Sequence, residues 1–180
     1  MGRSLFNPSY ICRRTDILAL VPQSAIKELD IGCSVGALGR EIKARKSAIV
    51  FGIEIEPDMD EVAESKLDKV YWGDVESLNL PELLGDMTFD CNIFGDDLEH
   101  LKDPRTVLTD LTEHLDREGD VIASKPNLRH YTTILSLLSG YWPYRDRGIH
   151  DRIHLRFFAL ENITEMFEDA GLRILKFRRT

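Results

Sequence analysis

Cysteine is scarce in this 180-residue chain, and neither a long apolar run nor an excess of basic residues is present. The three cysteines (Cys12, Cys33 and Cys91) are odd in number and widely spaced, which argues against a disulfide framework or a zinc site and fits a reducing cytoplasm. No apolar stretch reaches the roughly 18 residues that span a bilayer, and residues 1–10 lack the apolar core of a secretion signal. The sequence therefore predicts a cytoplasmic protein without membrane insertion.

The acidic balance excludes a second class of protein. Lys and Arg number 23 against 31 Asp and Glu, a net charge of −8, whereas a general nucleic-acid coat needs surplus cations to neutralise phosphates. Apolar residues make up 43% and charged residues 30%, which is ordinary for a folded globular protein. With 180 residues and no internal repeat, we expect a single domain over residues 1–180 that binds no nucleic acid.

Strand and helix patterns alternate along the chain. Strands are expected at residues 25–31, 48–55, 69–72, 89–94, 120–124 and 172–177. Helices are expected at about 37–45, at 57–67, from Asp103-Pro104 onward and around 163–170, where Gly171 supplies the stop. This alternation predicts an α/β fold, a Rossmann-like three-layer α/β/α sandwich with a mostly parallel sheet.

Residues 125–156 differ in composition from the rest of the chain. They contain six Lys and Arg against two Asp, a net charge of +4, which leaves −12 for the remainder. The same stretch holds three of the five histidines and several aromatic residues. Because loops at the strand ends of α/β sheets usually carry the ligand, we expect a substrate-facing insertion at residues 126–156 rather than a solvated linker.

A glycine-rich turn follows the first expected strand. Gly32, Gly36 and Gly39 are spaced Gly-x-x-x-Gly-x-x-Gly, which differs from the Gly-x-Gly-x-x-Gly pattern of dinucleotide binding because Ser34 stands near the second position. Glycines there let the backbone approach a ligand closely. Glu54 ends the second strand 22 residues after Gly32, where a carboxylate can accept hydrogen bonds from both hydroxyls of a ribose. Asp74, after the third strand, could accept the exocyclic amine of adenine.

Four segments in this order resemble the first four motifs of class I S-adenosylmethionine (SAM)-dependent methyltransferases: Glu28–Gly36, Gly52–Pro57, Gly73-Asp74 and Phe89–Pro104. The resemblance implies that SAM is the cofactor. It implies that Asp30, Gly32 and Gly36 frame the methionine part, that Glu54 holds the ribose, that Asp74 and Val75 contact adenine, and that Asp96 and Leu98 form a wall of the methyl site. The remaining cofactor contacts are expected from Cys33, Ser34 and Ile55.

A second resemblance covers the rest of the chain. Ala123–His130, Trp142–Asp146 and Asp151–Phe158 are similar to a bacterial methyltransferase subfamily found with glycosyltransferases of surface-polysaccharide and O-antigen assembly. It implies methyl transfer to a hydroxyl of a sugar or glycan intermediate, and the +4 segment would suit a phosphate-bearing acceptor. That subfamily usually has a hydroxyl residue where Ala159 stands, so the last helix is expected to lack its side-chain cap.

A sugar hydroxyl is a poor nucleophile, so a general base is expected. His154 is the first candidate, with Asp96 and His100 next. The alternative for His154 is a structural histidine packed beside Phe157 and Phe158, and the sequence leaves both open. Asp96, Glu99 and His100 also resemble the magnesium motif of small-RNA 2′-O-methyltransferases and some quinone-ring O-methyltransferases, although those families use Glu at the first position. His154 would then be the fourth ligand. The alternative is a helix-start acid beside a solvated histidine, so the sequence leaves a divalent metal open.

Two other functions are compatible with an α/β fold of this kind. An NAD-dependent oxidoreductase is disfavoured by the glycine spacing, and a non-catalytic SAM-binding partner protein would keep the fold without the reaction. Only three residues follow Phe177, so we expect the last antiparallel strand of the class I fold to be missing from a trimmed or shortened chain. The exposed sheet edge could then pair with a second copy in a homodimer.

Overall fold

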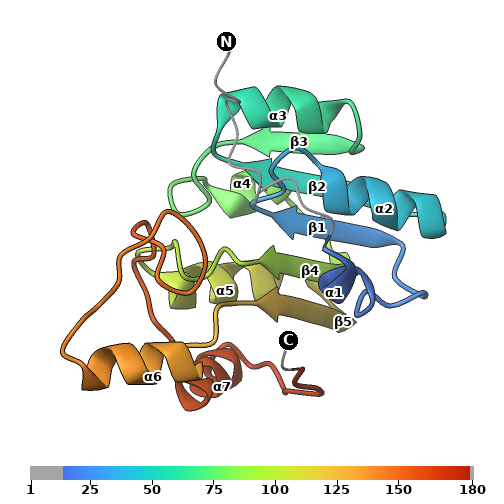
Figure 1. The fold of residues 1–180 in the computed structure, drawn as a ribbon. Helices are drawn as coiled ribbons and strands as arrows, with labels where there is room; N and C mark the ends of the chain where they lie inside the picture. The colour runs from blue at the N-terminus through green and yellow to red at the C-terminus, as the bar shows by residue number, and fades with distance from the viewer. Residues whose placement is uncertain (1–13, 179–180) are drawn as a thin grey trace, which may run out of the picture. The chain divides into compact units, whose positions relative to one another are not determined.

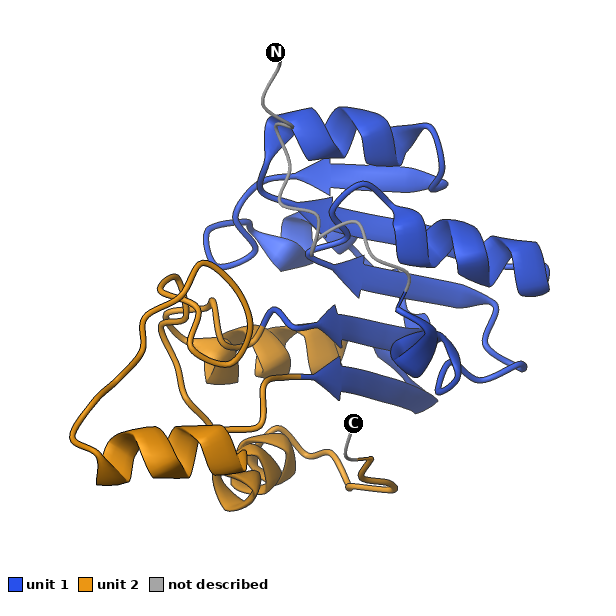
Figure 2. Ribbon diagram, viewed as in Figure 1, with its two compact units in different colours: residues 1–97, 114–124 blue, residues 98–113, 125–180 orange. Residues whose placement is uncertain are grey.

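The computed structural model describes residues 14–178 (Figure 1). They form two compact units (Figure 2). The first unit contains the described residues up to Asp97 together with His114–Ser124, and the second contains Leu98–Glu113 and the described residues from Lys125 onward. The single domain expected over residues 1–180 stays a prediction.

The first unit is built on a five-stranded sheet in the order β3-β2-β1-β4-β5. All its strand pairs are parallel, as predicted. The strands are β1 (Lys27–Ile31), β2 (Ile49–Glu54), β3 (Lys69–Trp72), β4 (Phe89–Gly95) and β5 (Leu115–Ser124). Strand order reverses between β1 and β4, and in open α/β sheets the carboxyl ends of the strands at such a point form the ligand crevice.

Four helices belong to the first unit: α1 (Thr15–Leu18), α2 (Ala37–Arg45), α3 (Pro57–Glu64) and α4 (Leu80–Leu84). Three belong to the second: α5 (Pro104–Glu113), α6 (Tyr131–Leu138) and α7 (Leu160–Asp169). The predicted bounds of α2 and the predicted start of α5 are confirmed. The helices α1, α4 and α6 were not predicted. The four and five residues of α1 and α4 are too few to show a helical repeat, whereas α6 lies in the segment that was interpreted by its charge and aromatic content.

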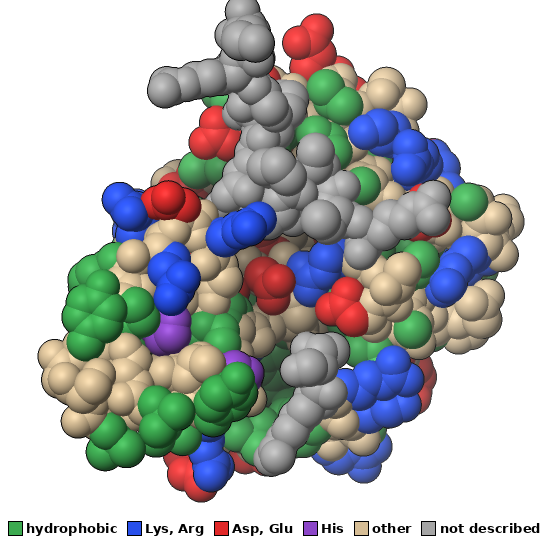
Figure 3. Space-filling model, viewed as in Figure 1, with side chains coloured by type: hydrophobic (Ala, Val, Ile, Leu, Met, Phe, Trp, Pro, Cys, Tyr) green, Lys and Arg blue, Asp and Glu red, His purple; other side chains and the backbone are tan. Residues whose placement is uncertain are grey.

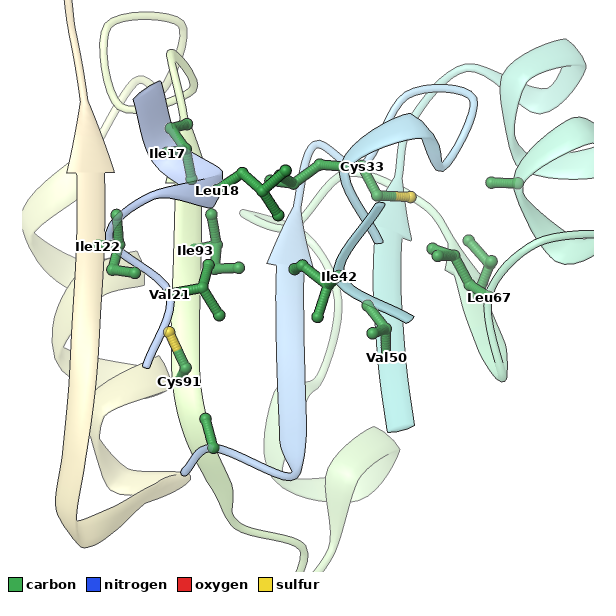
Figure 4. Packing of buried hydrophobic residues seen from close by; sticks show 14 residues of the cluster. Ile17, Leu18, Val21, Cys33, Ile42, Val50, Leu67, Cys91, Ile93 and Ile122 are labelled. Carbon is green, nitrogen blue, oxygen red and sulfur yellow. The ribbon is translucent and has the colours of Figure 1, made fainter. Parts of the chain in front are cut away.

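The apolar core of the first unit lies between the sheet and its helices. Ile17 of α1, Ile42 of α2 and Ile93 of β4 are almost completely buried and belong to one cluster (Figure 4). A buried ion pair lies in the same unit, where the Lys46 ammonium is 2.5 Å from the carboxylate of Glu28. Burial raises the pKa of Glu28 although Lys46 opposes that shift. The sheet and the helices of the first unit therefore enclose one cluster of buried apolar side chains.

The last predicted strand is wrong. Residues 172–178 form no strand in the structure, and the side chains of Leu175 and Phe177 are 70% and 52% exposed. An apolar, β-prone run becomes a strand only when neighbouring backbone accepts and donates its hydrogen bonds, and no ladder involves this run. The helix before it behaves as expected: Ala159 offers no side-chain cap to α7, and its N–H instead donates to Asn162 Oδ1 at 3.4 Å.

No helix in the part of the chain that the structure describes is long and apolar enough to cross a membrane.

Candidate functional site

The glycine turn after β1 has an unusual backbone. Gly32, Ser34 and Gly36 have φ of 63°, 50° and 67°, in the left-handed region, and Gly36 directly precedes α2. Ser34 adopts this conformation despite its side chain, which is costly for a residue other than glycine. Its N–H donates to Oε2 of Glu54 at 2.7 Å. The carboxylate of Glu54 therefore holds the turn in the shape that would face a ligand.

Glu54 ends β2 with its side chain only 5% exposed. Its second oxygen, Oε1, accepts the N–H of Glu56 at 2.8 Å. Burial raises the pKa of Glu54, and the N–H groups of Glu56, Ser34 and Ile55 act in the opposite direction. A carboxylate has about four acceptor positions, so the bonds from Ser34 and Glu56 leave capacity for further donors. Glu54 adjoins the glycine turn as the sequence predicted, and its ribose contact stays a prediction.

Asp30 is the second carboxylate at this turn. It lies near the end of β1 and is 3% exposed. Burial, followed by repulsion from Glu54, raises the pKa of Asp30 to about 7, while Arg14 lowers it. Burial also raises the pKa of the Cys33 thiol, and the negative charge of Asp30 adds to the shift. A positive charge beside the turn would therefore stabilise the ionised forms of Asp30 and Glu54.

Asp97 lies over the glycine turn, and sequence reasoning gave it no role. A Cβ built on Gly32 would collide with the carboxylate of Asp97. The sequence did offer one signal for it, since Asp97 follows Asp96 directly after β4 and is a second acid at the carboxyl end of that strand. A ligand that approaches the backbone at Gly32 would displace this side chain.

Replacing Gly32 with alanine should lower the free energy of unfolding by about 1–3 kcal/mol, from the positive φ and from the displaced Asp97. Urea denaturation followed by circular dichroism measures the change. Gly140→Ala is the matched control, since Gly140 has φ +75° but nothing within 4 Å of its Cβ position. Equal losses in the two variants would show that Asp97 does not crowd the turn.

Asp96 is occupied by contacts within the first unit. Its φ is 69°, its Oδ2 is 3.0 Å from the Arg14 guanidinium, and its Oδ1 accepts the Ser124 hydroxyl at 2.6 Å. Arg14 also donates to Ser124 Oγ at 2.6 Å. Sequence reasoning missed Arg14, because nothing local marks a residue that reaches across the fold. The structure therefore ties Asp96 to Arg14 and β5, and its catalytic role stays a prediction.

The predicted adenine residues are placed by a turn after β3. Asp74 accepts the N–H of Glu76 at 3.0 Å, and Val75 is buried. The side chain of Ile55 is exposed, and its carbonyl accepts the indole N–H of Trp72 at 3.1 Å. The Asp74 contact is that of an ordinary turn carboxylate, so it neither supports nor excludes adenine binding.

Two other predicted cofactor residues direct their side chains into packing. Cys33 belongs to the buried core cluster, and its N–H donates to the carbonyl of Ile53 at 3.1 Å. Leu98 is fully buried and begins the second unit. The carbonyl of Cys33 accepts the N–H of Gly36 at 2.9 Å, and the cofactor contact of Cys33 stays a prediction.

A separate polar cluster lies in the second unit. Glu99, His100 and His154 each offer a ligand atom, and these atoms all lie within 4.8 Å of one another. The two imidazole rings meet edge to face with centroids 4.9 Å apart. The carbonyl of Glu99 accepts the N–H groups of Leu155 and Arg156 at 2.8 and 3.0 Å. These two hydrogen bonds hold the loop that carries His154 against Glu99. The structure thus brings together three of the four predicted metal ligands, while Asp96 contacts Arg14 instead.

Lys125 lines a small hollow of the second unit together with Glu99, His154, Arg156 and Phe157. Its ammonium donates to the carbonyl of Phe158 at 2.8 Å. Burial lowers the pKa of Lys125 to about 8, and the charge of Glu99 opposes that shift. The sequence singled out the basic character of this segment but not Lys125 itself, whose burial only the fold reveals.

The three histidines of the basic segment have different surroundings. His150 is buried, its Nε2 is 3.1 Å from Thr133 Oγ1, and burial lowers its pKa. His130 precedes α6, where its Nδ1 accepts the N–H of Thr132 at 3.4 Å. These two are structural, and His154 is the one of the three that joins Glu99 and His100.

The parallel sheet and the turn at its strand ends define a Rossmann-like ligand-binding domain. A family model described as a methyltransferase domain matches residues 29–121, which include the last three residues of β1, the glycine turn, Glu54 and β4. The chain therefore belongs to the methyltransferase domain family.

The chain is also similar to individual methyltransferases. It is 29% identical over 163 residues to the ubiquinone biosynthesis O-methyltransferase of Cereibacter sphaeroides. The alignment covers 87% of this chain and 64% of that relative, so the chain spans less than two thirds of the relative's length. Its fold is similar to that of a SAM-dependent methyltransferase from Archaeoglobus fulgidus, with a TM-score of 0.69, 20% identity, and 94% and 73% of the two chains covered. A SAM-bound amino pentose methyltransferase from Micromonospora echinaspora matches with a TM-score of 0.50, 25% identity, and 61% and 47% covered.

Proposed function

We propose that the chain transfers a methyl group from SAM to a hydroxyl of a small acceptor. The observation that carries the proposal is the glycine turn with two buried carboxylates, Asp30 and Glu54, inside the segment that matches the methyltransferase family. SAM carries a sulfonium and an ammonium group, and such cations suit an anionic turn. The negative pyrophosphate of NAD does not, which disfavours the oxidoreductase alternative.

The residues at the turn fit this cofactor by their chemistry. Glu54 has acceptor capacity left for the two hydroxyls of a ribose after its bonds to Ser34 and Glu56. Asp30 would pair with the ammonium group, and a positive partner would return its raised pKa toward the ordinary range. Because Gly32 has no side chain, the cofactor could contact its backbone directly once the Asp97 carboxylate is displaced.

When bound, SAM supplies a methyl group already activated by its positive sulfur, which keeps the electron pair of the broken bond. The protein mainly aligns the reactants, an effect worth about 7–11 kcal/mol in well-oriented systems. We propose that His154 takes the proton from the acceptor hydroxyl, since a neutral imidazole is a suitable base near neutral pH. His100, edge to face with His154, orients that ring.

The acceptor that we propose is a sugar or glycan intermediate of polysaccharide biosynthesis. Support comes from the resemblance of residues 123–158 to the surface-polysaccharide subfamily and from the amino pentose methyltransferase among the similar structures. The similarity to an O-methyltransferase supports oxygen as the methylated atom. Lys125 and Arg156 lie in the hollow beside His154, so a phosphate-bearing acceptor would find positive charge there.

Calorimetric titration of the folded chain with SAM, S-adenosylhomocysteine and NADH tests the cofactor. We expect binding of the first two and none of NADH, and the absence of heat with SAM would contradict the proposal. Transfer of a labelled methyl group to a panel of nucleotide sugars and phenols tests the reaction. If SAM binds but His154→Ala leaves all transfer unchanged, the proton-accepting role of His154 is wrong. If no acceptor is methylated, the non-catalytic SAM-binding protein is favoured.

As the alternative to His154 acting as the base, we propose that Glu99, His100 and His154 hold a divalent metal ion, which would bind the acceptor hydroxyl and make it more acidic. His154 would then be a metal ligand and would not accept the proton. Two imidazoles and one carboxylate suit Zn²⁺, Fe²⁺ or Mn²⁺ better than Mg²⁺, which prefers oxygen ligands. Bonds of about 2.0–2.2 Å require the ligand atoms to move closer than in this structure. The donor chemistry therefore fits a metal, and the group would contract on binding.

His154→Ala should weaken Zn²⁺ binding by about tenfold or more, because it removes one of three ligands. Calorimetric titration with Zn²⁺, Mn²⁺ and Mg²⁺ measures this. The control is His130→Asn, which removes a histidine outside the group and keeps an acceptor at the α6 N-terminus. Equal affinities in both variants would place the metal elsewhere, and no binding by the unaltered chain would remove the proposal.

A further inference from the structure

Helix α6 presents an apolar face to solvent. The side chains of Tyr131, Ile134, Leu135 and Leu138 are 66%, 47%, 60% and 79% exposed. Their spacing of i, i+3, i+4 and i+7 places all four on one side of the helix. Figure 3 shows hydrophobic side chains gathered over α6 at the lower left. An ordinary surface helix buries such a stripe, so this one is available to an outside partner.

The opposite side of α6 is fastened to the second unit, which fixes the direction of the apolar face. Thr133 is fully buried, and its hydroxyl lies 3.1 Å from Nε2 of His150. The ring of His150 meets Trp142 edge to face at 4.9 Å, and Trp142 meets Phe157 at 5.1 Å. The contacts of Thr133 and His150 on one side of α6 therefore hold the helix with its apolar stripe facing solvent.

Basic and tyrosine side chains accompany the stripe in sequence. Arg129, Arg145, Arg147 and Arg152 are exposed, and the segment 125–156 carries +4 within a chain of −8. Tyr141 and Tyr144 follow α6 with 62% and 68% exposure. Tyrosine combines an apolar ring with a polar tip and is favoured where hydrocarbon meets water. Apolar, aromatic and cationic groups together match the surface of an anionic bilayer.

We propose that α6 docks the protein on an anionic membrane surface. The helix lies in the plane of the interface with Ile134, Leu135 and Leu138 at the acyl boundary, and the arginines contact headgroup phosphates. Eight residues make a helix of about 12 Å, so it rests on the bilayer and does not cross it. A second copy fits less well, because a two-fold interface would place the same basic segment against itself. The proposal is independent of the methyl-transfer proposal.

Flotation of the full chain with vesicles tests the proposal. Vesicles of phosphatidylglycerol and phosphatidylcholine in equal amounts should carry the protein, and pure phosphatidylcholine vesicles should carry much less. Leu135→Gln/Leu138→Gln should reduce binding about tenfold or more. Its control is Ile26→Gln/Leu175→Gln, which alters two side chains of similar exposure outside α6. Arg145→Gln/Arg147→Gln should reduce binding about thirtyfold. Arg40→Gln/Arg117→Gln, which removes two exposed charges elsewhere, should not.

Each variant is checked for native circular dichroism and unchanged SAM titration, so that loss of binding reports the surface and not the fold. The proposal is overturned if the unaltered chain stays unbound with both kinds of vesicle, or if the α6 and control variants lose binding equally. It is also overturned if sedimentation shows a dimer that Leu135→Gln/Leu138→Gln dissociates, because the stripe would then belong to a second copy.

Discussion

Glu54→Gln is expected to weaken SAM binding by about a hundredfold, close to 2.7 kcal/mol. The substitution removes the negative charge and one acceptor oxygen from the carboxylate beside the glycine turn. Hydrogen bonds to a charged acceptor are each worth about 1.5–3 kcal/mol, and the proposed ribose contact uses two. The Ser34 and Glu56 N–H groups also lose one of their acceptors, so a small loss of stability should accompany the loss of affinity.

Calorimetric titration with S-adenosylhomocysteine measures the affinity, and circular dichroism confirms that the variant is folded. Glu56→Gln is the control, since Glu56 is an exposed carboxylate two residues away. We expect it to bind as the unaltered chain does. Unchanged affinity in Glu54→Gln would exclude a ribose contact by Glu54, and with it the proposed position of the cofactor.

Asp30→Asn is expected to raise the free energy of unfolding of the cofactor-free protein by about 2–4 kcal/mol at about pH 8. The pKa of Asp30 is about 7 in the folded protein because of burial and the neighbouring Glu54. In the unfolded chain it is about 3.9. Between these values the unfolded state releases the proton and the folded state retains it, so stability falls as the pH rises from about 4 to 7. Asparagine removes that cost.

Urea denaturation at about pH 4 and about pH 8 tests the sign. The two proteins should differ little at the lower pH, where Asp30 is protonated in the folded state and about half protonated in the unfolded state. Asp86→Asn, at an exposed position, should change stability little at either pH. A gain for Asp30→Asn that is the same at both values would mean that its charge is not the cause. The same variant should bind SAM more weakly, because the carboxylate that destabilises the free protein is the proposed partner of the ammonium group.

Much of the first unit follows from local sequence. The ends of β3 and α2 lie where the β-rich run 69–72 and the turn before Ala37 predicted them. The nearness of Glu54 to the glycine turn also followed, because adjacent parallel strands place their carboxyl ends together. The strand predicted at residues 172–177 was wrong for the converse reason. Its apolar pattern is present, but no strand of the sheet pairs with it.

The amino-acid sequence by itself determined the parallel sheet, the glycine turn and the residue types that a cationic cofactor would meet, because these depend on short-range patterns. Only the tertiary structure decided that Asp97 covers Gly32, that burial moves the pKa of Asp30, and that Thr133 turns the apolar stripe of α6 outward. Each of these depends on which distant side chains become neighbours and on how much water they exclude. Desolvation and contact are properties of the packed molecule, and no local pattern contains them.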